Sequence, residues 1–184
     1  MANTRMTIKG IARWPKLTNP DTYNGQIIGW TIQVEPAEGE YDRLMKEFSE
    51  QLAMAKTDKE FDGKQWLEHP NIGIVENKDG TKCFKFKKIY EFRDKKTGEL
   101  VRTNVPIYDK HGVPCEVEIG NGSEIIVAFS PRPYHMNKNN NGLSLRLDAV
   151  QVLNLKSRAM GAEYFGFQVD DEDEQSGISE NPFA

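Results

Sequence analysis

The chain has 184 residues, of which 38% are hydrophobic and 28% are charged, values that are typical of one soluble globular domain. No apolar run approaches the roughly 20 residues that a membrane helix needs. The N-terminal segment lacks the apolar region of a signal peptide, so we expect a cytoplasmic protein without a membrane partner. The two cysteines, Cys83 and Cys115, are too few for a disulfide framework, and we expect reduced thiols.

The charge is distributed unevenly along the chain. Its formal net value is -4, but six of the 28 acidic residues lie in the last fifteen positions, which contain no Lys or Arg. The remaining 22 acidic residues face 24 basic ones, so residues 1–169 carry about +2. The sequence therefore predicts a mildly basic body, residues 1–169, followed by an acidic tail, residues 170–184, with too little apolar surface to fold.

Six strands and one main helix are predicted in the body. The helix covers about sixteen residues from Glu40, because Leu44, Phe48, Leu52 and Ala55 recur at helical spacing. A shorter helical turn is possible over residues 61–67. Alternating apolar and polar residues predict strands over residues 5–14, 25–35, 81–92, 101–108, 123–130 and 143–155.

Two polar segments between these strands are expected to be loops: PKLTNPDTYNG before the second strand and the asparagine-rich PRPYHMNKNNNG before the last. Short strands with turn signals between them and a single helix favour a small closed barrel. The predicted fold class is thus all-β with one main helix, arranged as an OB-like barrel.

Enzyme signatures are missing from the sequence. It contains no GxGxxG, GxxxxGK[ST], GxSxG or HExxH motif. The three histidines are far apart, and Asp58, Glu60 and Asp62 are interpreted as solvated charges rather than magnesium ligands. We therefore expect no catalytic residues, no metal and no cofactor.

The strand over residues 81–92 carries the strongest functional signal, because basic residues alternate there with aromatic rings. Cations that pair with phosphates beside rings that stack on bases are typical of single-stranded nucleic-acid sites. The candidate contacts in this region are Lys82, Lys85, Lys87, Lys88, Tyr90 and Arg93. The rings fit a core face equally well, and in that case the lysines still form a basic stripe.

Further candidate contacts lie elsewhere in the body. They are Arg13, Trp14 and Lys16 near the first strand, Arg132 and Tyr134 in the expected asparagine-rich loop, and Arg146 on the last strand. Tyr134 could instead belong to a structural turn held by Pro131 and Pro133. A surface salt bridge is the alternative for Arg146.

The acidic tail opposes the body in charge and can compete with phosphate for it. After the acids, Phe183 is a candidate anchor for a partner protein, and a merely solubilising tail is the alternative. The tail residues concerned are Asp170, Asp171, Glu172, Asp173, Glu174 and Phe183.

From about residue 80 onward the chain resembles the OB-fold single-stranded DNA-binding proteins of tailed bacteriophages. The resemblance is carried by DKHGVPCEVEIGNGSEIIVAFSPRPY, by NGLSLRLDAVQVLNL and by the acidic tail with Phe183. It implies a replication and recombination protein that coats single strands and recruits replication proteins, such as polymerase and primase-helicase, through its tail. Two features depart from the family pattern: Ala184 follows the phenylalanine, and the helix falls between the second and third strands.

Two functions from different classes remain open at this point. The first is a non-catalytic single-stranded DNA-binding protein. The second is a protein-interaction module, or a phage-encoded inhibitor whose acidic tail mimics DNA. The ability of the body to bind an oligonucleotide distinguishes them.

Overall fold

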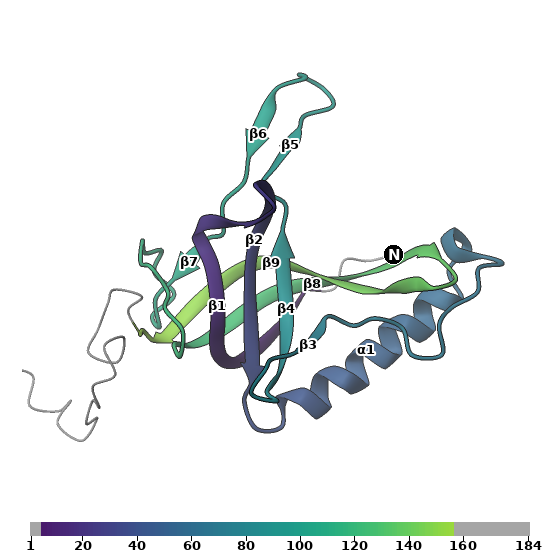
Figure 1. The fold of residues 1–184 in the computed structure, drawn as a ribbon, viewed down its shortest axis with the longest axis horizontal. Helices are drawn as coiled ribbons and strands as arrows, with labels where there is room; N and C mark the ends of the chain where they lie inside the picture. The colour runs from purple at the N-terminus through teal and green to yellow at the C-terminus, as the bar shows by residue number, and fades with distance from the viewer. Residues whose placement is uncertain (1–4, 157–184) are drawn as a thin grey trace, which may run out of the picture.

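The computed structural model describes residues 5–156 (Figure 1). The predicted boundary at residue 169 and the predicted disordered tail, residues 170–184, lie outside the described residues. The elements are β1 (Met6–Tyr23), β2 (Gln26–Pro36), α1 (Glu40–Lys56), a short 3-10 helix (Lys59–Phe61), β3 (Ile74–Glu76), β4 (Lys82–Lys88), β5 (Glu91–Arg93), β6 (Leu100–Arg102), β7 (Ile107–Tyr108), β8 (Glu124–Asn137) and β9 (Asn140–Asn154).

Five of these strands close into a barrel. The order β1-β2-β4-β9-β8 returns to β1, because β1 pairs with β8 and β4 pairs in parallel with β9. This connectivity is that of a five-stranded Greek-key barrel and confirms the predicted OB-like fold with one main helix. The helix lies between the second and third barrel strands, β2 and β4, as the sequence predicted.

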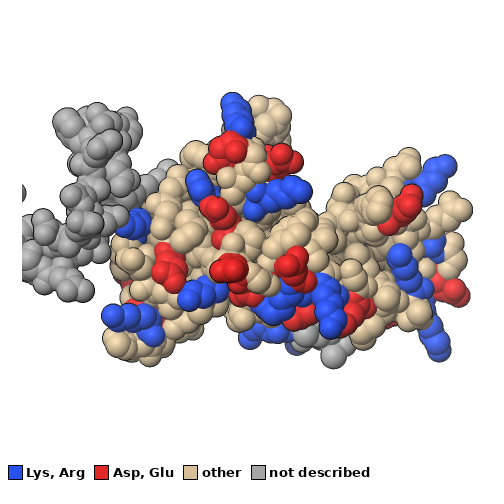
Figure 2. All heavy atoms as spheres, turned by 90° about the horizontal axis from the view of Figure 1, so that it is seen from below, with Lys and Arg blue, Asp and Glu red and all other residues tan. Residues whose placement is uncertain are grey.

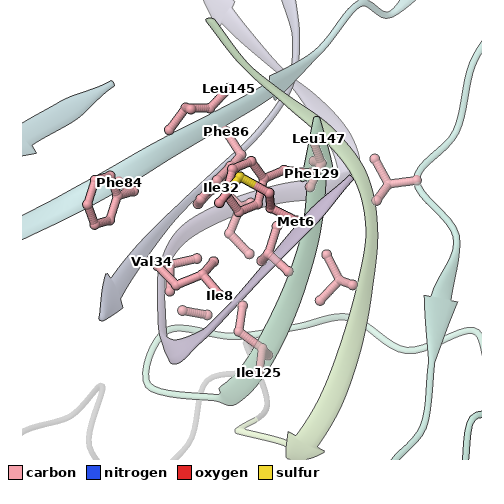
Figure 3. Packing of buried hydrophobic residues seen from close by; sticks show 14 of the residues in the cluster. Met6, Ile8, Ile32, Val34, Phe84, Phe86, Ile125, Phe129, Leu145 and Leu147 are labelled. Atoms are coloured by element: carbon pink, nitrogen blue, oxygen red, sulfur yellow. The ribbon is translucent and has the colours of Figure 1, made fainter. Parts of the chain in front are cut away.

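The barrel is filled by side chains from all five strands (Figure 3). Phe86 of β4 and Phe129 of β8 are fully buried, with ring centroids 4.8 Å apart. Each alternates along its strand with residues on the outer surface, because successive side chains of a strand point to opposite faces. The direction of a side chain on β4 therefore decides whether it belongs to the core or to the surface.

Helix α1 packs on the barrel through the residues that the sequence predicted. Leu44, Phe48, Leu52 and Ala55 are its buried positions. Phe48 makes an edge-to-face contact with Phe84 and another with Phe129, at centroid distances of 5.8 and 6.1 Å. The helix thus covers one side of β8 and β9, as Figure 1 shows.

Both predicted loops are wrong, because strands continue through them. β1 extends to Tyr23 and stays paired with β2 across bulges, which accommodate Pro15 and the left-handed Trp14. β8 and β9 continue into a long hairpin with only Lys138 and Asn139 between them. The segment before β3 stabilises this hairpin, since the Asn71 N–H donates to the carbonyl of Asn141 at 2.9 Å.

Two predicted strands and the predicted helical turn also differ from the structure. Residues 81–92 divide into β4 and β5, residues 101–108 divide into β6 and β7, and the short strand β3 was not predicted, so residues 5–156 contain nine strands in place of the predicted six. The chain leaves the barrel after β4 to form the β5–β6 hairpin, a separate two-stranded sheet. Within residues 61–67 only Phe61 is helical, and Trp66 packs edge-on against its ring.

Among residues 5–156, no helix is both long enough and apolar enough to cross a membrane. Cys83 and Cys115 are free, as the sequence predicted.

Candidate nucleic-acid interface

A groove runs along the outside of the barrel where β4 and β9 meet. It consists of two hollows of about 740 and 850 Å³, which share Lys87, Ser144 and Arg146 in their walls. We call it the seam groove. Among the described residues, its charged lining consists of the cations Arg5, Lys85, Lys87, Lys88, Arg132 and Arg146 and a single acid, Asp148.

The alternation of β4 places lysines in this groove. Phe84 and Phe86 point into the core, with 1% and 0% of their surface exposed, so Lys85 between them and Lys87 after them point outward. The two rings are therefore core residues, whereas the predicted basic stripe is present. On β9, Arg146 lies outside for the same reason, between the buried Leu145 and Leu147.

Arg132 and Arg146 form a cationic pair in the groove. Repulsion from Arg132, added to the larger effect of burial, lowers the pKa of the Arg146 guanidinium. Among residues 5–156, neither arginine has an acidic side chain within salt-bridge distance, and Nε of Arg132 is buried without a hydrogen-bond partner. The salt bridge considered for Arg146 is therefore not present in this part of the chain. Adjacent guanidinium groups without an acid are suited to binding a phosphate.

Asp148 limits the groove at one end. Its Oδ2 accepts hydrogen bonds from Nε of Arg5 at 3.1 Å and from Oγ of Ser130 at 2.6 Å. The carboxylate is thus already paired, and it leaves the cations further along the groove unneutralised.

The opposite end of the seam groove has a more apolar wall. Tyr134 and Met136 of β8 line it, and Met136 is 74% exposed. The Tyr134 hydroxyl donates to Oδ1 of Asn140 at 3.2 Å and accepts from Nδ2 of Asn71 at 3.3 Å. Tyr134 therefore belongs to a strand rather than to the predicted loop or turn, and its ring is held at the groove by its hydroxyl.

The face of the molecule seen from below carries charges of both signs (Figure 2). Figure 2 shows the face turned toward the bottom of Figure 1, where Lys and Arg lie interspersed with Asp and Glu. Mixed charges of this kind are usual for a solvated surface. The seam groove is distinguished by cations that outnumber its single acid.

Comparisons with known proteins show the family of the chain. Residues 24–155 match the family model described as single-stranded DNA-binding protein, bacteriophage T7. The chain belongs to this family. It is 33% identical over 104 residues to the single-stranded DNA-binding protein of Escherichia phage T7 and 35% identical over 96 residues to that of Enterobacteria phage T3. These alignments cover 55% and 50% of this chain but only 45% and 41% of the two relatives, so less than half of each relative is matched.

Solved structures of phage single-stranded DNA-binding proteins share the fold. The crystal structure of gp2.5, the single-stranded DNA-binding protein encoded by bacteriophage T7, superposes with a TM-score of 0.69 at 25% identity, covering 93% of this chain and 97% of that one. The single-stranded DNA-binding protein from bacteriophage Enc34, in complex with single-stranded DNA, superposes with a TM-score of 0.58 at 14% identity, covering 85% and 89%. The second likeness concerns the fold alone.

Within this family fold, some candidate contacts lie away from the seam groove. Arg13 is paired with Glu35, with Nη2 2.7 Å from Oε2, and this hydrogen bond raises the pKa of Arg13. Trp14 is 57% exposed on β1, and its backbone N–H donates to Oδ1 of Asn121. Lys16 is the register partner of Thr31, which is in turn the partner of Lys87, so it lies two strands away from the groove.

Three other candidates occupy the ends of their elements. Lys82 lies at the far end of β4 and pairs in register with Glu76 of β3. Arg93 is on the β5–β6 hairpin, where Nη1 donates to the carbonyl of Gly98 at 2.8 Å. Tyr90 is half-buried at the base of that hairpin, with its ring 5.3 Å from Trp30.

Several groove residues were not predicted from the sequence. Ser144 could have been found, because it alternates with Leu143 and Leu145 on a strand that was predicted. Arg5, Ser130 and Met136 gave no such signal, since their place in the groove depends on the closure of β8 and β9 against the rest of the barrel.

Proposed function

We propose that this protein is a non-catalytic single-stranded DNA-binding protein that coats and protects single strands during phage DNA replication and recombination in the host cytoplasm. Arg132 and Arg146 lie beside Lys87 without an acidic partner among residues 5–156, and this observation carries the proposal. Phosphates of the strand pair with these cations, while exposed bases lie against Tyr134 and Met136. Membership of the family and the barrel topology support it.

The other candidate contacts extend this site in the proposal. Lys85 and Lys88 line the groove directly. Arg13, Trp14, Lys16, Lys82, Tyr90 and Arg93 lie farther from the groove, and Arg13 is paired with Glu35. These outer residues are expected to contribute less than the groove cations, because paired or distant charges release fewer counterions.

The tail has a regulatory part in the proposal. Residues 1–169 form the DNA-binding domain, and the acidic residues 170–174 of the tail compete with phosphates for the groove. The same tail, through Phe183, recruits replication proteins such as polymerase and primase-helicase.

A binding experiment on the full chain tests the proposal. Fluorescence anisotropy with labelled oligo-thymidine compares the wild type, the groove variant Arg146→Ala and the control variant Lys46→Ala, which removes an exposed cation from α1. We expect Arg146→Ala to bind the oligonucleotide more weakly than the wild type does, and Lys46→Ala to bind it with the affinity of the wild type. Equal affinities for all three would contradict the proposed site, and absence of binding by the wild type would contradict the function.

The tail is tested separately with a full-length variant in which residues 170–174 carry Asn for Asp and Gln for Glu. Tighter DNA binding than that of the wild type is expected, because the competing charge is removed. Unchanged affinity would contradict competition by the tail.

A further inference from the structure

The β5–β6 hairpin stands away from the barrel, as Figure 1 shows. Phe92 is the register partner of Val101, and Arg93 that of Leu100. Two strands of three residues each are marginally stable by themselves. The hairpin must therefore be held at its base.

That base is fixed to the barrel core. Nε1 of Trp30, which is buried, donates to the carbonyl and to Oγ1 of Thr103 at 3.2 and 3.0 Å. The Thr103 N–H donates to the carbonyl of Tyr90 at 2.8 Å. The Tyr90 ring packs on Trp30 and carries the Arg102 guanidinium 5.5 Å from its centroid. The hairpin is consequently a positioned arm.

The arm exposes apolar side chains that the core does not use. Ile89 is 56%, Phe92 45% and Leu100 53% exposed. Exposed apolar groups gathered on one element commonly mark a contact surface. The turn of the hairpin adds the exposed cations Lys95 and Lys96. A ring with cations beside it is suited to single-stranded DNA, because bases stack and phosphates are neutralised.

The arm also continues the seam groove. Lys87, Lys88 and Ile89 follow one another in the groove wall, and β5 begins two residues later. A DNA strand that leaves the groove past Lys88 therefore meets the hairpin next. We propose that the β5–β6 hairpin is a second DNA contact, in which Phe92 stacks on a base and the turn lysines neutralise phosphates. This inference rests on the proposed function and adds a residue-specific extension of the site.

An oligonucleotide length series tests the arm on the full chain. Single-stranded sites on OB folds cover about 4 to 16 nucleotides, so we would compare thymidine oligomers of about 6 and about 18 nucleotides. The Phe92→Ala variant should lose about tenfold in affinity for the longer oligomer and nothing for the shorter one, which the groove alone can hold. The control Val113→Ala removes an exposed apolar side chain outside the groove and should change neither affinity.

Other outcomes would contradict the proposed DNA contact of the hairpin. If Phe92→Ala left the affinity for the longer oligomer unchanged, or weakened both oligomers equally, the hairpin would not extend the site. If DNA affinity were unchanged but self-association in sedimentation disappeared, the exposed residues would serve a second copy of the chain instead. Failure of the wild type to bind either oligomer would mean that the proposed function itself had failed.

Discussion

Lys87 of β4 and Arg146 of β9 are register partners at the parallel seam that closes the barrel. Neighbouring strands lie about 4.8 Å apart, so two positive side chains emerge close together on the outer surface. Arg132 lies near enough to lower the pKa of Arg146. The pairing of β4 with β9 therefore closes the barrel and also brings these positive side chains together.

Removing one cation of this pair should weaken binding to single-stranded DNA. For Arg146→Ala or Lys87→Ala we expect a loss of roughly 1.5 to 3 kcal/mol, the usual worth of a hydrogen bond to a charged group. The slope of log affinity against log salt should also become shallower by about 0.7 for each phosphate that the variant no longer neutralises. Anisotropy titrations across a salt series measure both, and a slope equal to that of the wild type would contradict pairing with a phosphate.

Replacing Arg146 with a neutral residue should not destabilise the DNA-free protein. Arg146→Gln relieves repulsion from Arg132, so the free energy of unfolding should rise by about 0.5 kcal/mol or remain equal. Urea denaturation at low salt measures the change. A clear decrease in stability would mean that Arg146 has a structural role beyond the groove.

Gly142 should be intolerant of any side chain. Its φ is +153°, and a Cβ placed there would lie 1.9 Å from the carbonyl oxygen of Asn71. Gly142→Ala should therefore detach the segment before β3 from the β8–β9 hairpin and cost more than the roughly 1 to 2 kcal/mol that a positive φ alone costs. Gly98→Ala, at φ +73° with open space around it, is the matched control. Thermal unfolding compares the two, and equal destabilisation would contradict the role of close packing at Gly142.

Glu40 should contribute stability that depends on pH. Its pKa is lowered chiefly by the hydrogen bond from Nε of Arg43, and the Lys9 N–H also donates to it. Because the folded pKa lies below the unfolded one, this stability is present at neutral pH and is lost as the pH falls through the folded pKa.

Glu40→Gln should then be less stable than the wild type by about 0.5 kcal/mol at pH 7, the scale of an exposed helix pair. The difference should vanish in acid, whereas Glu50→Gln, an exposed acid on the same helix, should be neutral at both pH values. Urea denaturation at the two pH values is the measurement. A difference that persists in acid would contradict the ionic origin.

Local patterns in the sequence predicted the helix and the alternation along β4, but they left open whether its rings belong to the core. Leu44 and Phe48 recur at helical spacing, and Phe84 and Phe86 alternate with lysines, so each element carries its own signal. Nonlocal contacts explain the misses. The polar segment around Asn141 becomes a strand because Asn71 hydrogen-bonds to it from another part of the chain, which no local pattern reveals.

The candidate site was only partly predicted, again because nonlocal contacts decide which residues come together. Lys87 and Arg146 could be assigned to outer faces of their strands individually, but their pairing required the barrel to close. The sequence alone does not separate Arg13 from these residues, and only the fold shows it paired with Glu35.

The most direct test of the central claim is a titration of labelled oligo-thymidine and a matched duplex with the wild type and with the double variant Lys87→Ala/Arg146→Ala, at low and moderate salt. If about four phosphates are neutralised, single-strand affinity of the wild type should fall by about 50-fold between roughly 50 and 200 mM salt. The double variant should bind more weakly and respond less to salt, with little duplex binding by either protein. Equal binding by both proteins, or preference for the duplex, would contradict the seam groove as a single-stranded DNA site.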